Sequence, residues 1–114
     1  MLTVEKLKDF GANTAEGLSR CINKEDFYIR MVNMVLADKN FDRLARAVAD
    51  NDVKNAFEAC HALKGATGNV SLTPIYEPVC ALTEQLRGAT ELGDVSAHYN
   101  QIMDAHERLK KLAE

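Results

Sequence analysis

One histidine in the middle of this 114-residue chain has neighbours that suit phosphoryl chemistry. The sequence around His61 is ACHALKGATGNV over residues 59–70. A neutral imidazole is a competent nucleophile at pH 7, and Lys64, one helical turn later, can balance an incoming phosphoryl charge. Gly65 and Gly68 follow on the same side and leave bare backbone there, so that a bulky partner can approach. We interpret His61 as an accessible nucleophile with a cation beside it.

The surrounding residues predict the helix that presents this histidine. Read at helical period, the apolar positions form one stripe. The stripe consists of Val53, Ala56, Phe57, Cys60, Leu63, Thr67 and Val70. His61 lies just off its shoulder, beside Phe57, and Asp52 is the expected N-cap. Because the stripe continues beyond Gly65, we expect a helix over about 53–70 and not a glycine C-cap at Gly65.

Several residues near the histidine have a second, simpler interpretation. Glu58, one turn earlier, can orient the imidazole by accepting a hydrogen bond from Nδ1, or it can be an ordinary exposed glutamate. Lys54 can add to the positive field, but a solvated lysine accounts for it as well. His61 itself can be a boundary histidine that packs on Phe57. Its combination with Lys64 and the glycines favours the phosphoacceptor interpretation.

Metal and nucleotide sites are the main competing chemistry. Glu58-x-x-His61 is half of a di-iron bundle motif, but no second Glu-x-x-His pair exists in the chain. A zinc site at Cys60, His61 and Cys80 lacks ligand spacing, since the first two point ~100° apart on a helix. No Walker motif or other phosphate-binding loop is present. We therefore expect no metal site, no cofactor of its own and no kinase activity.

The hydrophobic pattern predicts an all-α fold. Four long amphipathic segments with short links indicate an antiparallel up-down four-helix bundle, with one or two short N-terminal helices covering one end. The long segments are residues 24–50, 53–70, 73–87 and 95–112, and the short ones are 2–10 and 15–21. Register continues across 38–40, which favours one helix, kinked or straight, over two collinear helices. Asn23 is its expected N-cap. Thr73 is the expected N-cap of the third segment, with Pro74 at the first helical position, and Pro78 should loosen the first turn of that helix.

Composition indicates one globular domain spanning 1–114, with its bundle core at about 24–112. Hydrophobic residues make up 46% and charged residues 27% of the chain, which excludes disorder. The net charge of −3 without a Lys/Arg run argues against nucleic acid as a partner. No long apolar run or signal sequence is present, so we expect a soluble, cytoplasmic protein without membrane contact. The three widely spaced cysteines fit reduced thiols.

These residues resemble a known signature. The segment 61–65, His-Ala-Leu-Lys-Gly, followed by Gly68 and Asn69, is similar to the motif of the histidine phosphotransfer (HPt) domain family. The resemblance covers roughly residues 18–112. The family often carries glycine ten residues after the histidine, where this chain has Ser71.

The resemblance implies a monomeric phosphorelay intermediate. His61 would accept a phosphoryl group from a receiver-domain aspartate and pass it to another receiver, while Lys64 stabilises the phosphate. Response-regulator receiver domains, and a hybrid sensor histidine kinase, are the implied partners, and the receiver would supply the acidic pocket and the Mg²⁺. The alternative is a helical adaptor that binds and modulates a receiver or kinase without carrying phosphate.

Overall fold

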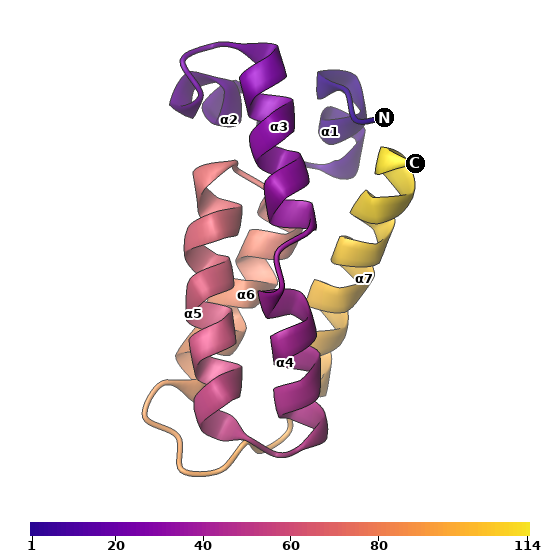
Figure 1. Cartoon of the computed structure of the whole chain (residues 1–114). Coiled ribbons are helices and arrows are strands. Elements are labelled where there is room, and N and C mark those ends of the chain that lie inside the picture. The colour runs from indigo at the N-terminus through magenta and orange to yellow at the C-terminus, as the bar shows by residue number, and fades with distance from the viewer.

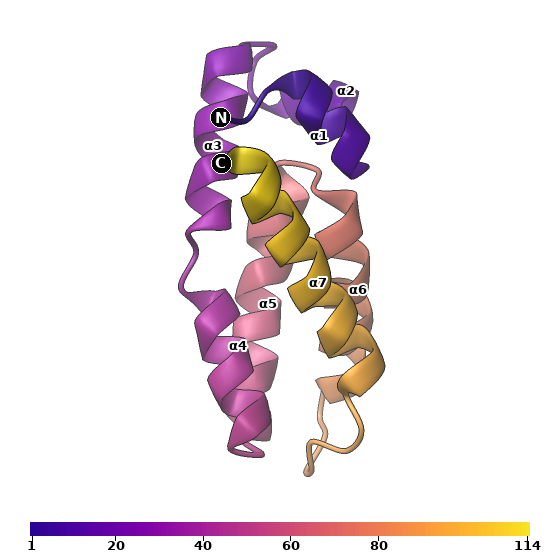
Figure 2. The same ribbon diagram turned by 90° about the vertical axis from the view of Figure 1, so that its right-hand side faces the viewer.

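The computed structural model describes all 114 residues, and they form an all-helical protein, as the sequence predicted. The helices are α1 (Val4–Phe10), α2 (Thr14–Arg20), α3 (Glu25–Leu36), α4 (Asn40–Ala49), α5 (Val53–Asn69), α6 (Thr73–Leu86) and α7 (Ser96–Ala113). Helices α4 to α7 lie side by side, and successive ones run in opposite directions (Figure 1). Helices α1 to α3 gather at the end of the molecule where α5 gives way to α6 (Figures 1 and 2).

The prediction of a single helix over residues 24–50 is wrong, because α3 and α4 are separate. In a continuous helix the Leu36 carbonyl would accept the N–H of Asn40. Here the ring nitrogen Nε2 of His106 bonds to that carbonyl at 2.9 Å, and the Asn40 N–H donates to Oδ1 of Asp38 at 2.8 Å. Both groups of the hydrogen bond that the break removes are therefore satisfied, one of them by a side chain 70 positions away.

The predicted helix starts are correct in part. Asp52 caps α5 as expected, and its Oδ1 accepts the backbone N–H of Asn55 at 3.1 Å. Asn23 does not cap α3, because it adopts a left-handed conformation with φ of 56°. The N-cap position belongs to Lys24, which makes no side-chain capping bond. Two acidic residues in the first turn of α3 still complement the helix dipole.

Helix α6 begins one position earlier than predicted and tolerates its internal proline. Leu72, not Thr73, occupies the N-cap position, and Pro74 lies in the first turn. The loosened turn expected at Pro78 is absent, since the helix is continuous over 73–86. Pro78 is buried, and the helix continues through it although proline has no N–H to donate.

One hydrophobic core joins all seven helices. Its largest fully buried side chains include Tyr28, Leu63, Ile75, Leu82 and Ile102, and each stabilises the fold by roughly 1.5–3 kcal/mol. On α5 the buried residues are Ala56, Ala59, Cys60, Leu63 and Thr67. Burial raises the pKa of the Cys60 thiol to about 12, so this cysteine is an inert core residue. None of the helices has the length and apolar character that a membrane span requires.

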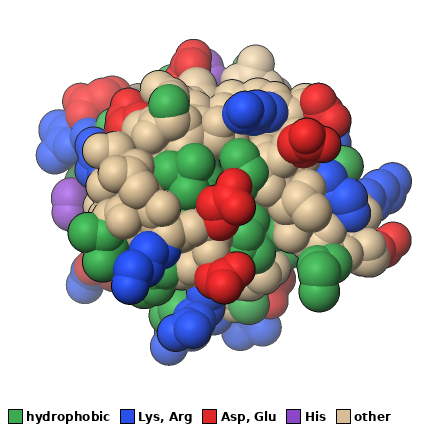
Figure 3. Space-filling model, turned by 90° about the horizontal axis from the view of Figure 1, so that it is seen from above, with side chains coloured by type: hydrophobic (Ala, Val, Ile, Leu, Met, Phe, Trp, Pro, Cys, Tyr) green, Lys and Arg blue, Asp and Glu red, His purple; other side chains and the backbone are tan.

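The N-terminal helices are fastened to the long ones by specific contacts. The Tyr28 hydroxyl donates to the Val70 carbonyl at 2.9 Å, which ties α3 to the turn between α5 and α6. Nη1 of Arg108 donates to the Phe10 carbonyl at 3.1 Å, and its guanidinium lies over the Phe10 ring. Figure 3 views this end, where hydrophobic side chains gather between charged ones. The large exposed hydrophobic side chains all belong to this part of the chain: Met1, Ile22, Phe27 and Met34.

Candidate functional site

The buried stripe of α5 determines which of its residues face solvent. With Cys60 and Leu63 fully buried, His61 and Gly65 are exposed on the opposite side, and Lys64 is half-buried one turn beyond the histidine. His106 is the one histidine whose ring makes a hydrogen bond within the chain, so both ring nitrogens of His61 are free for a partner. The face therefore presents a free imidazole beside an ammonium group.

A phenylalanine from the same helix supports the imidazole. The rings of Phe57 and His61 are stacked, with centroids 6.0 Å apart and planes 18° apart. The guanidinium of Arg87, at the end of α6, lies 5.5 Å from the Phe57 ring centroid. Nη2 of Arg87 also pairs with Glu84 at 3.1 Å, and this bond lowers the pKa of the glutamate, with a smaller contribution from Lys64. Arg87 belongs to no recognised sequence motif, so its place beside Phe57 could not be predicted from the sequence.

Glu58 does not have the orienting role considered for it. Its carboxylate accepts a hydrogen bond from Nη2 of Arg43 at 2.6 Å, and the same nitrogen donates to Oδ1 of Asn55 at 2.7 Å. No hydrogen bond joins Glu58 to His61. The glutamate instead links α5 to α4, because an arginine on that neighbouring helix lies within reach of it.

The two glycines of the motif have different surroundings. A Cβ placed on Gly65 would meet nothing within 4 Å, so the space beside this residue is open. A Cβ on Gly68 would lie 2.9 Å from Cε1 of Tyr76, which packs against the α5 backbone from α6. Both glycines are inside the helix and neither has a positive φ, which confirms that they are not C-caps. Of the two, only Gly65 leaves unoccupied space for a partner.

A shallow groove extends along this face from the histidine towards the N-terminal helices. It is lined by Asn13 at the N-cap of α2, by Glu16 and Arg20 of α2, by His61, Lys64, Gly65, Gly68 and Asn69 of α5, and by Ser71, Thr73, Tyr76 and Glu77. The predicted phosphoacceptor, cation and glycines thus share one surface. The α2 and α6 side chains were not predicted, because they come from other helices.

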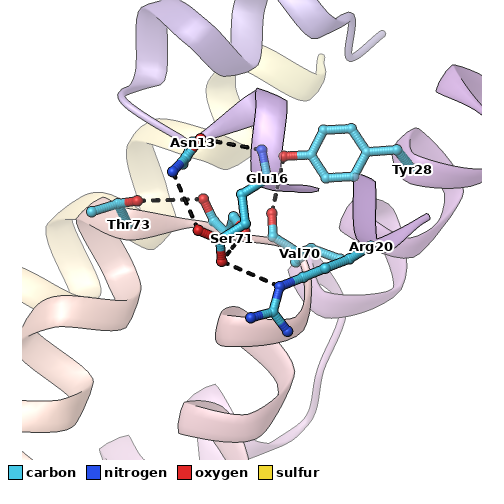
Figure 4. Close-up of polar contacts among 7 residues, drawn as sticks. All are labelled: Asn13, Glu16, Arg20, Tyr28, Val70, Ser71 and Thr73. Carbon is cyan, nitrogen blue, oxygen red and sulfur yellow. Dashed lines mark hydrogen bonds and ion pairs between the residues drawn. The ribbon is translucent and has the colours of Figure 1, made fainter. Parts of the chain in front are cut away.

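Ser71 retains a glycine-like backbone at the end of the groove. Its φ is 56°, in the left-handed region that disfavours a side chain by roughly 1–2 kcal/mol. The Ser71 carbonyl accepts the Asn13 N–H at 3.0 Å, and its hydroxyl donates to Oε1 of Glu16 at 3.2 Å (Figure 4). These bonds to α2 offset the strain and preserve the turn that follows α5.

The other histidines lie away from this face. His106 is buried against Phe41 and bonded to the Leu36 carbonyl. His98 is half-buried and lines a separate groove between α6 and α7. His61 is therefore the one histidine that combines exposure with a neighbouring cation on the groove.

An all-helical domain that presents an exposed histidine and a lysine on one helix face has the features of a phosphoryl carrier. The family model of the Hpt domain matches residues 34–113, from the end of α3 through α7. The chain belongs to the Hpt domain family, whose members are phosphotransfer modules that act with receiver domains in phosphorelay signalling. No curated protein and no solved structure gives a significant match.

Proposed function

We propose that this chain carries a phosphoryl group on His61 between receiver-domain aspartates in two-component signalling. The observation that carries the proposal is an exposed imidazole with both ring nitrogens free, one turn from Lys64 and beside the open space at Gly65. Membership of the Hpt domain family supports the same chemistry. Receiver domains of response regulators, and a hybrid sensor histidine kinase, are the proposed partners.

The transfer needs little from this chain beyond the nucleophile. The Nε2 lone pair of a neutral His61 attacks the phosphorus of the aspartyl phosphate, and an N–P bond forms as the P–O bond to the aspartate breaks. The electron pair leaves on the aspartate carboxylate, and the imidazole proton remains on Nδ1 or passes to water. The Lys64 ammonium balances the phosphoryl charge. Mg²⁺ and the acidic pocket belong to the partner receiver, and this chain contributes no metal or cofactor of its own.

We regard α4 to α7 as an antiparallel up-down four-helix bundle within one domain over 1–114, acting as a cytoplasmic monomer. It has no kinase activity of its own, because no nucleotide-binding motif occurs in the chain. The docking surface is the groove that includes His61, Lys64 and Gly65.

The test is transfer of radiolabelled phosphate from a panel of phosphorylated receiver domains to the purified chain. We expect label on wild-type protein, labile in acid and stable in base as a phosphoramidate is, and none on His61→Gln. A variant that still accepts label would contradict the assignment of His61. The adaptor alternative would be favoured if neither the wild-type chain nor His61→Gln takes up label and both still bind and modulate the receiver.

A further inference from the structure

One wall of the groove beside His61 is built by a helix that the family model does not include. The match covers residues 34–113, whereas Glu16 and Arg20 of α2, together with its N-cap Asn13, line the groove. All three side chains are exposed. This wall is therefore a feature of this chain that the family motif does not describe.

Arg20 has the donors that an acidic partner would need. Its Nε bonds to Oε1 of Glu16 at 3.2 Å, and its side chain is 52% exposed. The two terminal nitrogens make no hydrogen bond within the chain, and Figure 4 shows them pointing away from the Glu16 carboxylate. A guanidinium with two free nitrogens can bind a carboxylate through paired hydrogen bonds, which a lysine cannot match.

The position of Arg20 is fixed relative to α5. Glu16, which holds the Arg20 Nε, also accepts hydrogen bonds from the Ser71 hydroxyl at 3.2 Å and from Nδ2 of Asn13 at 3.3 Å. Gly17 on the same helix packs so closely on Tyr28 that an added Cβ would lie 2.5 Å from the tyrosine ring. Because α2 is seated in this way, the helix that carries Arg20 does not have to be ordered when a partner binds, which reduces the entropy lost on binding.

Arg20 lines the groove at the end away from His61, where its partner Glu16 bonds to Ser71. The groove extends from His61 past Gly68 to Ser71. At 1.5 Å per residue, Gly68 alone lies about 10 Å further along the helix axis than His61. Lys64, only one turn away, is the cation for the phosphate. A partner that seats its aspartyl phosphate on His61 would meet Arg20 with the surface around that aspartate.

We propose that Arg20 is a docking residue that binds a carboxylate on the surface of the partner receiver domain, and that α2 thereby contributes to the choice of receiver. The inference rests on the proposed phosphoryl transfer through His61. A charge at the rim of an interface changes mainly the association rate and its dependence on salt. Arg20 should therefore affect binding of the receiver and not the chemical step.

The experiment compares Arg20→Gln with Arg30→Gln, a matched control that removes an exposed arginine of α3 outside the groove. Transfer from a phosphorylated receiver is measured over a range of receiver and salt concentrations. The same proteins are also phosphorylated with potassium phosphoramidate, a small donor that needs no docking surface. Thermal melts report the fold of each variant.

We expect Arg20→Gln to raise the half-saturating receiver concentration roughly three- to tenfold at low salt, with the maximal rate unchanged. The difference from wild type should shrink as salt increases, and Arg30→Gln should behave as wild type. Equal receiver dependence in all three proteins would overturn the inference. So would slower labelling of Arg20→Gln by phosphoramidate, since that would indicate a disturbed His61.

The design separates this inference from the proposed function. If wild-type protein gains no phosphate from either donor, the phosphoryl transfer itself is wrong, and the role of Arg20 falls with it. If phosphate reaches His61 and only the Arg20 effect is missing, the proposed function stands and the docking role alone is overturned.

Discussion

His61 and His106 are the same side chain in two opposite settings. Each stacks on a phenylalanine, but the centroids are 6.0 Å apart for Phe57 and His61 and only 3.6 Å apart for Phe41 and His106. His61 is exposed on the groove, whereas His106 is 9% exposed. His106 also bonds through Nε2 to a backbone carbonyl, and His61 bonds to nothing within the chain.

The comparison shows that the fold leaves one histidine accessible with both ring nitrogens free and commits the other to a structural hydrogen bond. Because a carbonyl only accepts, Nε2 of His106 carries the proton and is committed to the Leu36 carbonyl at the end of α3. Burial lowers the pKa of His106, although the bond to Leu36 opposes this shift in part. A neutral, buried imidazole serves as a structural clamp at the break between α3 and α4.

Exchanging the two histidines for inert residues should give opposite results. His61→Gln should lose all phosphate and change the free energy of unfolding by no more than about 0.5 kcal/mol, as is usual for exposed sites. His106→Leu should still accept phosphate but be less stable by roughly 1–3 kcal/mol, because the Leu36 carbonyl loses its partner. The amount of bound phosphate and the free energy of urea unfolding are measured for each variant. A folded His106→Leu protein that no longer accepts phosphate would contradict the structural role.

Lys64 should matter next most among the residues around His61. Lys64→Ala should slow transfer by about one to two orders of magnitude, since a charge-assisted contact contributes roughly 1.5–3 kcal/mol. Lys54→Ala, which removes an exposed lysine two turns before the histidine, should leave the rate nearly unchanged. Rapid-mixing kinetics with one phosphorylated receiver measures both. Equal rates in the two variants would mean that Lys64 is only solvated.

The two glycines should respond differently to the same substitution. Gly65→Gln should raise helix stability by a few tenths of a kcal/mol yet obstruct the receiver, because the open space beside His61 is filled. Gly68→Gln should lower stability by about 1–3 kcal/mol, because its side chain meets Tyr76.

Tyr76→Ala provides the control for the glycine pair. In that background Gly68→Gln should lose most of its penalty, while the effect of Gly65→Gln should persist. Thermal melts and receiver titrations are compared for wild type, for Tyr76→Ala and for each glycine variant in both backgrounds. If Gly68→Gln is as stable as wild type with Tyr76 present, the packing of Tyr76 from α6 does not exclude a side chain at position 68 of α5.

The smallest expected effect is a pH dependence that only the buried histidine produces. Below the ordinary histidine pKa of 6.5, the unfolded chain takes up a proton that the folded His106 resists. Stability should therefore fall as the pH drops from 6.5 to the lowered pKa of the folded state, and should not change from this cause above 6.5. Urea unfolding between about pH 5 and pH 7 should show a flatter profile for His106→Leu. Identical slopes in the variant and the wild type would argue against the buried neutral imidazole.

The sequence alone was sufficient for features contained within one helix. The apolar stripe of α5 and the Asp52 cap are local, so the helix and its start could be predicted. The placement of His61, Lys64 and Gly65 on one face follows from helical spacing, because residues three and four apart share a side of any α-helix. The family motif could be recognised because its residues all lie within this one helix.

Only the tertiary structure decided the features that depend on contacts between helices. The Leu36 carbonyl at the break finds its partner in His106. Tyr76 occupies the space beside Gly68, and Arg43 pairs with Glu58. Arg20 joins the groove because α2 is fastened to the turn after α5. Helical periodicity predicts which side of a helix a residue occupies. Packing alone determines which neighbour occupies the space beside it.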